Sequence, residues 1–212
     1  MKLFNSTQKW TNWWARRKID WKVHYLNPNH PHRLLIVETL KGLEWGCVIE
    51  LGCGAGANLM AILKAMPGRK VQVGGIDINP DAIALAEKMF IGGLFKVGSG
   101  DDVMLSDKAS DVILTDMYMI YITPNRMAKQ LTEIKRLARN YVVMCEFHSE
   151  SWWERLALKW REGYNMYDWR KLLEKHGFYG INLYKIPKEF WSESDLQQKY
   201  CHIIVAKVPK DY

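Results

Sequence analysis

The sequence predicts an α/β fold: a mixed seven-stranded sheet with helices on both faces, preceded by an N-terminal helical segment. From residue 47 onward, short β-rich runs alternate with longer helical ones, which is typical of parallel strand–helix–strand units. The last two β-rich runs have only a polar loop between them, so they can pair antiparallel. A content of 48% hydrophobic and 25% charged residues excludes a disordered or collagen-like chain.

The strands are predicted where β-branched and apolar residues cluster. In chain order they are Cys47–Leu51, Val71–Ile78, Leu94–Val97, Asp111–Asp116, Tyr141–Glu146, 178–186 and 200–208, with the polar loop at Ser192–Gln198. Apolar residues at helical spacing predict the helices 57–66, 80–90, 124–140, 152–160 and 167–178. Pro80 suits a first helical turn, and Asn79 before it is the better placed helix cap.

The most informative motif is VIELGCGAGANL, residues 48–59, in which a strand runs into Gly52, Gly54 and Gly56 and then into a helix. Glycines allow a tight turn and bring helix-start N–H groups against a ligand. Glu50 at the strand end can accept hydrogen bonds from a ligand ammonium or from the glycine loop. The spacing is GxGxG, whereas the dinucleotide fingerprint is GxGxxG.

A second acid ends the next predicted strand. Asp77 in GGIDINPDAI lies about twenty residues further on, where a carboxylate can hold both hydroxyls of a ribose. Ile78 beside it can cover an adenine face. As an alternative, Asp77 would only cap the following helix.

Residues 48–59, 76–83, 98–107 and 110–121 together resemble the class I S-adenosylmethionine-dependent methyltransferases, and the resemblance covers about residues 36–207. It implies a Rossmann-like fold and S-adenosylmethionine as the cofactor. It also implies that one set of residues surrounds the methionine and ribose portions, namely Glu50, Gly52, Gly54, Gly56 and Asn58, while Asp77 holds the ribose.

The same resemblance predicts an acid soon after the third strand, against the adenine amino group. In VGSGDDVML, Ser99 stands where that acid commonly lies, and Asp101 and Asp102 follow it. We expect Asp101 or Asp102 to reach the adenine edge. The alternative is a solvated acidic turn.

The fourth predicted strand ends in LTDMYMIY, at the same sheet edge as the glycine loop. Asp116 and Tyr118 are therefore expected near the transferred methyl group, Asp116 also as a cofactor contact. After the fifth strand, His148 is a candidate general base that Glu146 would orient, or else a cap of the next helix. The candidate catalytic residues are thus Asp116, Tyr118 and His148.

The N-terminal segment differs from the rest of the chain. Residues 1–41 hold eight Lys/Arg residues against Asp20 and Glu38, which is +6 of the net +7. On a helix, Trp10, Trp14, Arg17 and Trp21 would share one face. This face could pack on the sheet or on a second subunit, bind an anionic partner, or form the lid that the resemblance implies.

We therefore expect residues 1–35 to form a basic, tryptophan-rich lid segment and residues 36–212 the methyltransferase domain. Residues 24–33 are interpreted as a linker in which Arg33 and Tyr25 could touch cofactor or substrate, and His30 and His32 belong to a turn-rich connector. The four cysteines form no CxxC pair and are interpreted as reduced core thiols, so no metal site is predicted.

The function expected is methyl transfer to a hydroxyl or amine of a small or medium acceptor, such as a sugar or an anionic metabolite. The alternatives are an RNA or DNA methyltransferase with a basic N-terminal arm, and a non-catalytic S-adenosylmethionine-binding subunit. Exposed tryptophans could also indicate a homodimer. Without a signal sequence or a long apolar stretch, we expect a cytoplasmic protein with no transmembrane segment.

Overall fold

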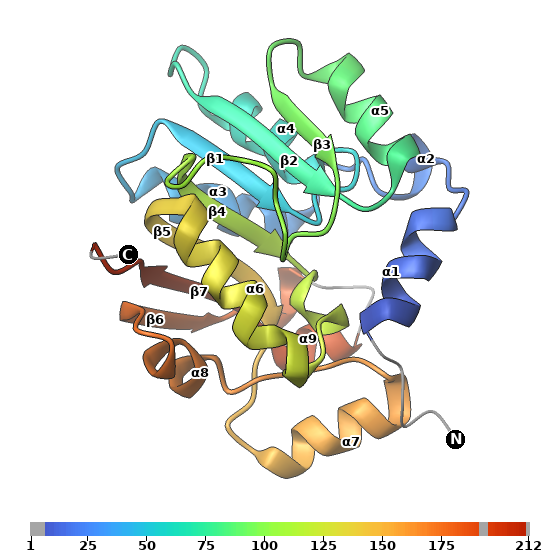
Figure 1. The fold of residues 1–212 in the computed structure, drawn as a ribbon, viewed down its shortest axis with the longest axis vertical. Coiled ribbons are helices and arrows are strands. Elements are labelled where there is room, and N and C mark those ends of the chain that lie inside the picture. Colours follow the sequence, from blue (N-terminus) through green and yellow to red (C-terminus); the bar gives the residue numbers. More distant parts are fainter. Residues whose placement is uncertain (1–6, 191–194, 211–212) are drawn as a thin grey trace.

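The computed structural model describes residues 7–190 and 195–210, and it confirms the mixed seven-stranded sheet (Figure 1). The strand order is β3-β2-β1-β4-β5-β7-β6. The first five strands are parallel, and β7 pairs antiparallel with both β5 and β6. The strands are β1 Cys47–Leu51, β2 Gln72–Asp77, β3 Leu94–Val97, β4 Ser110–Asp116, β5 Ala138–Phe147, β6 Tyr179–Lys185 and β7 Cys201–Lys207.

Helices connect the strands and precede them. They are α1 Thr7–Arg16, α2 Trp21–His24, α3 Pro31–Lys41, α4 Ala57–Ala65, α5 Pro80–Met89, α6 Pro124–Leu137, α7 Trp152–Glu162, α8 Trp169–Lys175 and α9 Asp195–Tyr200, with short 3-10 turns η1 Met119–Tyr121 and η2 Lys188–Phe190. Asn79 caps α5 as predicted, because its side chain accepts hydrogen bonds from the backbone N–H groups of Asp81 and Ala82.

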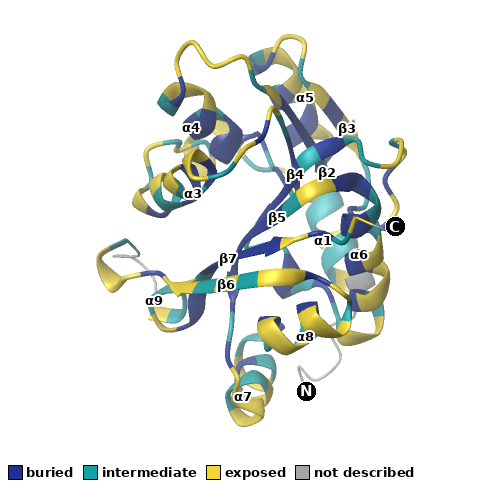
Figure 2. Cartoon of the chain, turned by 90° about the vertical axis from the view of Figure 1, so that its left-hand side faces the viewer, coloured by how far each residue is buried: buried dark blue, intermediate teal, exposed yellow. Residues whose placement is uncertain are grey.

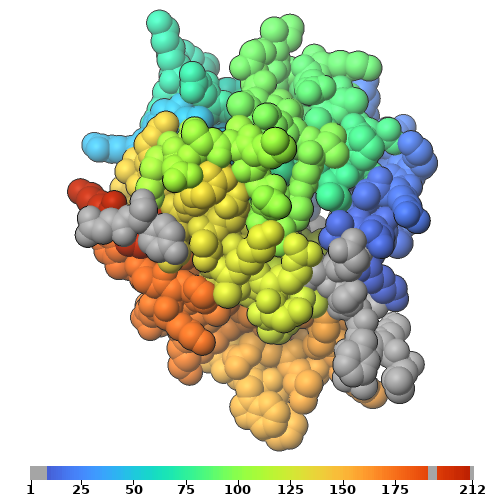
Figure 3. Space-filling model, viewed as in Figure 1, coloured from blue at the N-terminus to red at the C-terminus, as the bar shows by residue number. Residues whose placement is uncertain are grey.

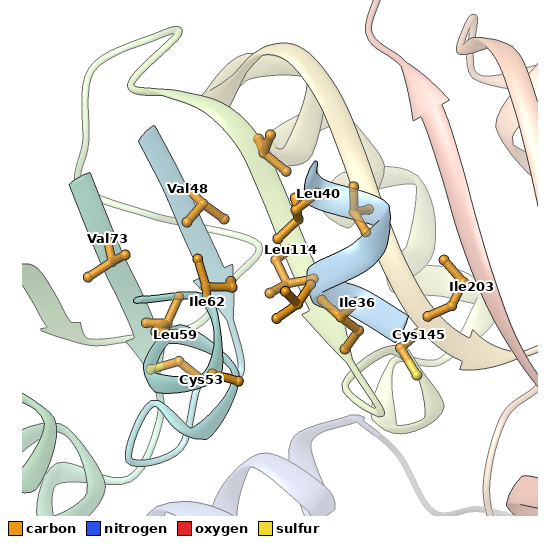
Figure 4. Close-up of a cluster of buried hydrophobic side chains, with 14 of the residues drawn as sticks. Ile36, Leu40, Val48, Cys53, Leu59, Ile62, Val73, Leu114, Cys145 and Ile203 are labelled. Atoms are coloured by element: carbon orange, nitrogen blue, oxygen red, sulfur yellow. The ribbon is translucent and has the colours of Figure 1, made fainter. Parts of the chain in front are cut away.

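Helices lie on both sides of the sheet, as Figure 2 shows, and two apolar clusters pack them against it. On one face, Ile36 and Leu40 of α3 and Leu59 of α4 pack against the strands (Figure 4). On the other, α6 and α8 bury Leu131 and Trp169. The central strands β1, β4 and β5 are therefore shielded from water on both sides, which is typical of parallel strands, whereas the edge strands β3 and β6 are largely exposed.

The N-terminal residues do not form the single helix on which the sequence prediction was based. The helix α1 ends at Arg16, and Trp21 begins the separate helix α2, which Asp20 caps. The two helices still bring Trp14 and Trp21 together, with ring centroids 6.3 Å apart. The helix α3 begins at Pro31 and so crosses the predicted domain boundary between residues 35 and 36.

Two predicted boundaries were wrong. The helix α6 ends at Leu137 rather than at residue 140, because β5 already begins at Ala138, where it pairs with Ser110 of β4. The predicted polar loop at Ser192–Gln198 contains the start of α9, and residues 191–194 of it lie outside the described residues. None of the helices in the described part of the chain is long and apolar enough to span a membrane.

Candidate active site

A cavity of about 550 Å³ opens at the carboxyl ends of the central strands. The strand order reverses between β1 and β4, because β2 and β3 are added on one side of β1 and β4 and β5 on the other. Open α/β sheets form their ligand crevice at such a point. The wall of the cavity is formed by the glycine loop after β1, by the ends of β2 and β4, by residues 98–100 after β3, and by residues of α1, α2 and α3. In Figure 1, α1 and α2 lie beside the edge toward which β1 to β4 point.

The glycine loop lies against the cavity with its backbone in the left-handed region. Gly52, Gly54 and Gly56 have φ values of +75°, +53° and +85°, which side chains disfavour. A Cβ atom at Gly52 would also lie 2.6 Å from the ring of Tyr118, and one at Gly54 would lie 3.1 Å from the ring of Trp21. Any other residue at these positions would strain the backbone, and its Cβ atom would crowd a neighbouring aromatic ring.

Asp77 lines the cavity and also fixes the glycine loop. Its Oδ2 accepts a hydrogen bond from the backbone N–H of Gly54 at 2.8 Å, and its Oδ1 accepts one from that of Asn79. Burial raises the pKa of Asp77, and these backbone donors oppose that effect. Ile78 lies beside it in the cavity wall. Both residues therefore line the cavity, and their contacts with ribose and adenine stay predictions.

Glu50 is a buried carboxyl group with one oxygen unpaired. Its Oε1 accepts a hydrogen bond from Asn58 Nδ2 at 2.6 Å, whereas its Oε2 has no partner among the described residues. Burial raises the pKa of Glu50 to about 8. Both Glu50 and Asn58 line the cavity. A buried, unsatisfied carboxylate oxygen is costly unless a ligand binds it, so this position is suited to a cationic group.

Asp116 connects the site to the start of α3. Its Oδ2 accepts hydrogen bonds from Arg33 Nη1 and His32 Nε2, both at 2.9 Å, and from Asn58 Nδ2 at 3.0 Å. Burial acts to raise the pKa of Asp116, but His32 and Arg33 outweigh burial and hold this pKa well below its usual range. Oδ1 of Asp116 has no partner in the described structure, and the residue lines the cavity as an ionised carboxylate.

His32 is the site residue that the sequence interpretation missed. It was assigned to a connector, but it lies in the first turn of α3, is only 4% exposed and lines the cavity. The signal was present in the spacing: Pro31 begins the helix, and His32 then precedes Ile36 and Leu40 at intervals of four residues on the buried face.

Tyr118 is held by a strained turn after β4. The preceding Met117 has a φ of +51°, and the buried Glu146 Oε1 accepts hydrogen bonds from the backbone N–H groups of Tyr118 and Met119, both at 3.0 Å. The phenol of Tyr118 donates a hydrogen bond to Gln130 Oε1, and burial raises the pKa of this phenol above its ordinary value. Tyr118 therefore stays neutral and acts as a wall of the cavity.

His148 is not brought to the cavity. Its Nδ1 accepts a hydrogen bond from the backbone N–H of Trp169, the first residue of α8, at 3.2 Å, and its ring packs on His202. Burial lowers the pKa of His148. Glu146 does not orient it, because that carboxyl group binds the turn after β4. The alternative role, a cap of the next helix, is wrong, because Ser151 caps α7; at α8 the N-cap residue is Asp168, and His148 binds only the N–H of Trp169 there.

Asp101 and Asp102 lie outside the cavity wall. Asp101 is buried and binds Arg126 and Ser99, whereas Asp102 is exposed and lies 3.9 Å from Lys129. The residues of this loop that line the cavity are Gly98, Ser99 and Gly100. An adenine contact by Asp101 or Asp102 stays a prediction that needs this loop to move.

The part of the cavity that faces the N-terminal segment is aromatic. Trp10 lies 5.0 Å from Tyr121 and 5.9 Å from Tyr164, measured between ring centroids. Trp14 lies 5.7 Å from Tyr121 and 6.1 Å from Tyr25. All five rings line the cavity. Burial raises the pKa of the Tyr121 phenol, so this part of the wall is formed by neutral rings.

One group in the described residues has ligand atoms close enough to hold a metal ion. Atoms of His32, Asp116 and Cys145 lie within 4.8 Å of one another. However, the guanidinium of Arg33 already binds Asp116, and the buried Cys145 thiol, whose pKa burial raises well above its usual value, lies against the Cys201 thiol. We assign no metal to this group.

Comparisons with known proteins agree with this geometry. Residues 48–140 match a family described as a methyltransferase domain. A chain from the complex of the Haloferax volcanii Trm112 methyltransferase activator has a TM-score of 0.68 at 17% identity, with 95% of this chain and 98% of that chain covered. Geranyl diphosphate C-methyltransferase from Streptomyces coelicolor A3(2) also has a TM-score of 0.68, at 12% identity, with 96% and 98% covered.

A third solved structure, from Thermotoga maritima, is described as a methyltransferase and possible histamine N-methyltransferase. It has a TM-score of 0.63 at 17% identity, with 95% of this chain and 96% of that chain covered. No curated protein sequence matches the chain. Residues 48–140 thus match a methyltransferase domain, and they lie in a sheet with Rossmann-like strand order. The domain match over residues 48–140 and the shared fold agree with the resemblance to the class I S-adenosylmethionine-dependent methyltransferases.

Proposed function

We propose that this enzyme methylates an amine of a small acceptor held against the aromatic part of the cavity. The observation that carries the proposal is Asp116: it lines the cavity as an ionised carboxylate whose Oδ1 has no partner among the described residues, and Arg33, the arginine among the described lining residues, is already bound to Asp116 and Asn58. An anionic acceptor would be repelled by the Asp116 carboxylate, whereas the N–H of an amine can donate a hydrogen bond to its unpaired oxygen. The wall therefore favours an amine over an anionic metabolite.

S-adenosylmethionine supplies an electrophilic methyl group on a sulfonium. We propose that Glu50 Oε2 binds its ammonium, that Asp77 binds the ribose hydroxyls and that Ile78 covers the adenine. The glycine loop provides the close backbone approach. The unpaired, buried oxygen of Glu50 and the absence of room for a Cβ at Gly52 support this fit.

The acceptor needs positioning more than it needs a base. Because Arg33 and His32 keep Asp116 ionised, Asp116 Oδ1 would accept a hydrogen bond from the acceptor amine and orient its lone pair. Tyr118 would close the cavity beside it. Neither group is suited to remove a proton at neutral pH, so the acceptor amine would have to bind in its neutral form.

The cofactor assignment is tested by calorimetric titration with S-adenosylmethionine and S-adenosylhomocysteine. We expect micromolar binding, on the order of −8 kcal/mol, that Asp77→Ala abolishes. The matched control is Glu87→Ala, which removes an exposed acid from α5 outside the cavity wall. A folded wild-type protein that binds neither ligand would contradict the assignment.

The acceptor class is tested by incubation with a labelled methyl donor and a panel of small amines, phenols, sugars and carboxylates. We expect label on amines. Label on sugars or carboxylates alone would overturn the amine proposal. Two alternatives give different results: a nucleic-acid methyltransferase binds oligonucleotides with strong salt dependence, and a non-catalytic subunit binds the cofactor without turnover with any acceptor.

A further inference from the structure

The helix α7 presents its apolar side to solvent. Trp152, Trp153, Leu156 and Trp160 are 54%, 64%, 47% and 63% exposed. At about 100° per residue these four side chains fall within an arc of about 100° on the helix. We call this set the tryptophan face. Figures 1 and 3 place α7 at one end of the molecule, where its outer side is uncovered.

The polar side of α7 is turned toward the protein. Glu154 accepts a hydrogen bond from Ser149 Oγ at 2.5 Å, and Arg155 Nη1 donates to the backbone carbonyls of Ser149 and Glu150. Leu158 is buried in the core. The helix is thus fixed by its polar side with its tryptophans outward, the reverse of the usual surface helix.

Exposed basic residues lie near the tryptophan face. Residues 150–162 hold three Lys/Arg and three Glu residues, and Arg161 on α7 is exposed. The helix α1 adjoins the end of α7, because Trp10 of α1 stacks on Tyr164, two residues after Glu162. Lys9, Arg16 and Arg17 in the N-terminal segment are exposed.

We propose that the tryptophan face docks the protein, in the plane of the interface, on a bilayer that contains anionic lipids. Tryptophan rings partition into the interface between lipid headgroups and acyl chains, and flanking Lys/Arg residues are attracted to anionic lipid. The net charge of +7 favours an anionic surface as the partner. Docking there places Tyr164, and with it the aromatic part of the cavity, next to the bilayer.

The test is flotation of the full-length protein with vesicles of phosphatidylcholine, with and without phosphatidylglycerol, and with no cofactor present. We expect the wild type to float with the phosphatidylglycerol vesicles. The double variant Trp153→Ser/Trp160→Ser should lower the partition coefficient at least about tenfold. The control is Ile91→Ser, which removes a side chain that is 96% exposed at the end of α5, away from the face.

Three results would overturn the proposal: a wild type that floats with neither kind of vesicle, a double variant that floats like the wild type, or a dimer in sedimentation velocity that the double variant dissociates while vesicles do not bind. The last result would assign the face to a second copy of the chain. Circular dichroism of the double variant establishes that it is folded. Because no methyl donor or acceptor is present, the result is independent of the proposed amine specificity.

Discussion

At the scale of single residues, Glu50 has the clearest consequence of its environment. The folded protein keeps this carboxyl group protonated up to a pKa of about 8, whereas its ordinary value is 4.5. Between these values the unfolded chain has released the proton and the folded chain has not. The contribution of Glu50 to stability is therefore fully present below 4.5 and is lost as the pH rises through about 8.

We predict that the free energy of unfolding of the ligand-free protein falls with pH across this window, by at most about 1.4 kcal/mol per pH unit for each such group. Glu146 has the same shift for the same reason, burial. Glu50→Gln should therefore make the fall of stability in urea denaturation from pH 5 to 8 less steep, by at most about 1.4 kcal/mol per pH unit. An unchanged slope would mean that Glu50 titrates near its ordinary pKa.

Binding of a cationic group to Glu50 should also release a proton. The same Glu50→Gln variant should then lose the buffer-dependent part of the binding enthalpy for S-adenosylmethionine. Glu146 provides the internal comparison, because its carboxyl group binds backbone N–H groups and does not line the cavity.

The residue scale also shows where sequence reasoning succeeded and where it failed. Glu50, Asp77 and Asp116 follow directly from strand ends and the glycine motif, and the structure brings all three to one cavity. The role suggested for His148 does not fit its position. Strand alternation places Glu146 and His148 on one face. It does not predict that Glu146 binds the turn after β4 while His148 binds the first N–H of α8.

At the scale of elements, the glycine loop combines two constraints that substitutions can separate. Gly68 has a φ of +81° and open space around its Cβ position, whereas Gly52 has a φ of +75° and the Tyr118 ring 2.6 Å away. A side chain at either position would strain the left-handed backbone, but only a side chain at Gly52 would also collide with the Tyr118 ring.

We predict that Gly68→Ala lowers the free energy of unfolding by about 1–2 kcal/mol through the left-handed backbone alone. Gly52→Ala should lower it by more, by about 3 kcal/mol, and should abolish cofactor binding. Urea denaturation and calorimetry measure both quantities. Equal effects of the two substitutions on stability would show that Tyr118 moves aside without cost.

Asn79 links two elements, the N-terminal segment and α5. Its Oδ1 caps α5, while its Nδ2 donates hydrogen bonds to the backbone carbonyls of Trp14 and Arg17 at 2.8 and 2.9 Å. These donors fix the end of α1 against the start of α5. The proposed lid is thus attached to the element that follows Asp77.

We predict that Asn79→Ser keeps the helix cap, because serine caps well, but releases the N-terminal segment. Hydrogen exchange of the backbone amides over residues 10–25 should accelerate at least about tenfold. Ser151→Ala is the matched control, since it removes the cap of α7 at a cost of about 1 kcal/mol without touching α1. Unchanged exchange over residues 10–25 would exclude Asn79 as the attachment.

At the scale of the whole molecule, the predicted N-terminal segment and the predicted domain share packing. Trp21 packs on Ala55 of the glycine loop and on Ala82 of α5, and α3 crosses the predicted boundary. We therefore expect the N-terminal segment and the domain to unfold together in one cooperative transition, because they bury surface against each other.

Cofactor binding should stabilise this single unit. S-adenosylhomocysteine at about 100 times its Kd adds about 2.7 kcal/mol, which corresponds to a rise of Tm of about 5–10 °C for a chain of this size. Differential scanning calorimetry should show one transition that moves as a whole. A first transition that ligand leaves unmoved would show that the N-terminal segment unfolds independently.

The sequence by itself determined the strands of the parallel half, the glycine loop and its two acids, because periodicity and motif spacing are local properties of the chain. The donor followed from the family resemblance that these motifs carry. The tertiary structure alone decided that His32 and Arg33 hold Asp116, that Asp101 binds Arg126 and that α7 turns its tryptophans outward. These are contacts between residues 25–84 positions apart, or choices of which face meets the core. The physical reason is that the pairing of a buried charge, and the side on which a helix is covered, depend on neighbours that only folding brings together.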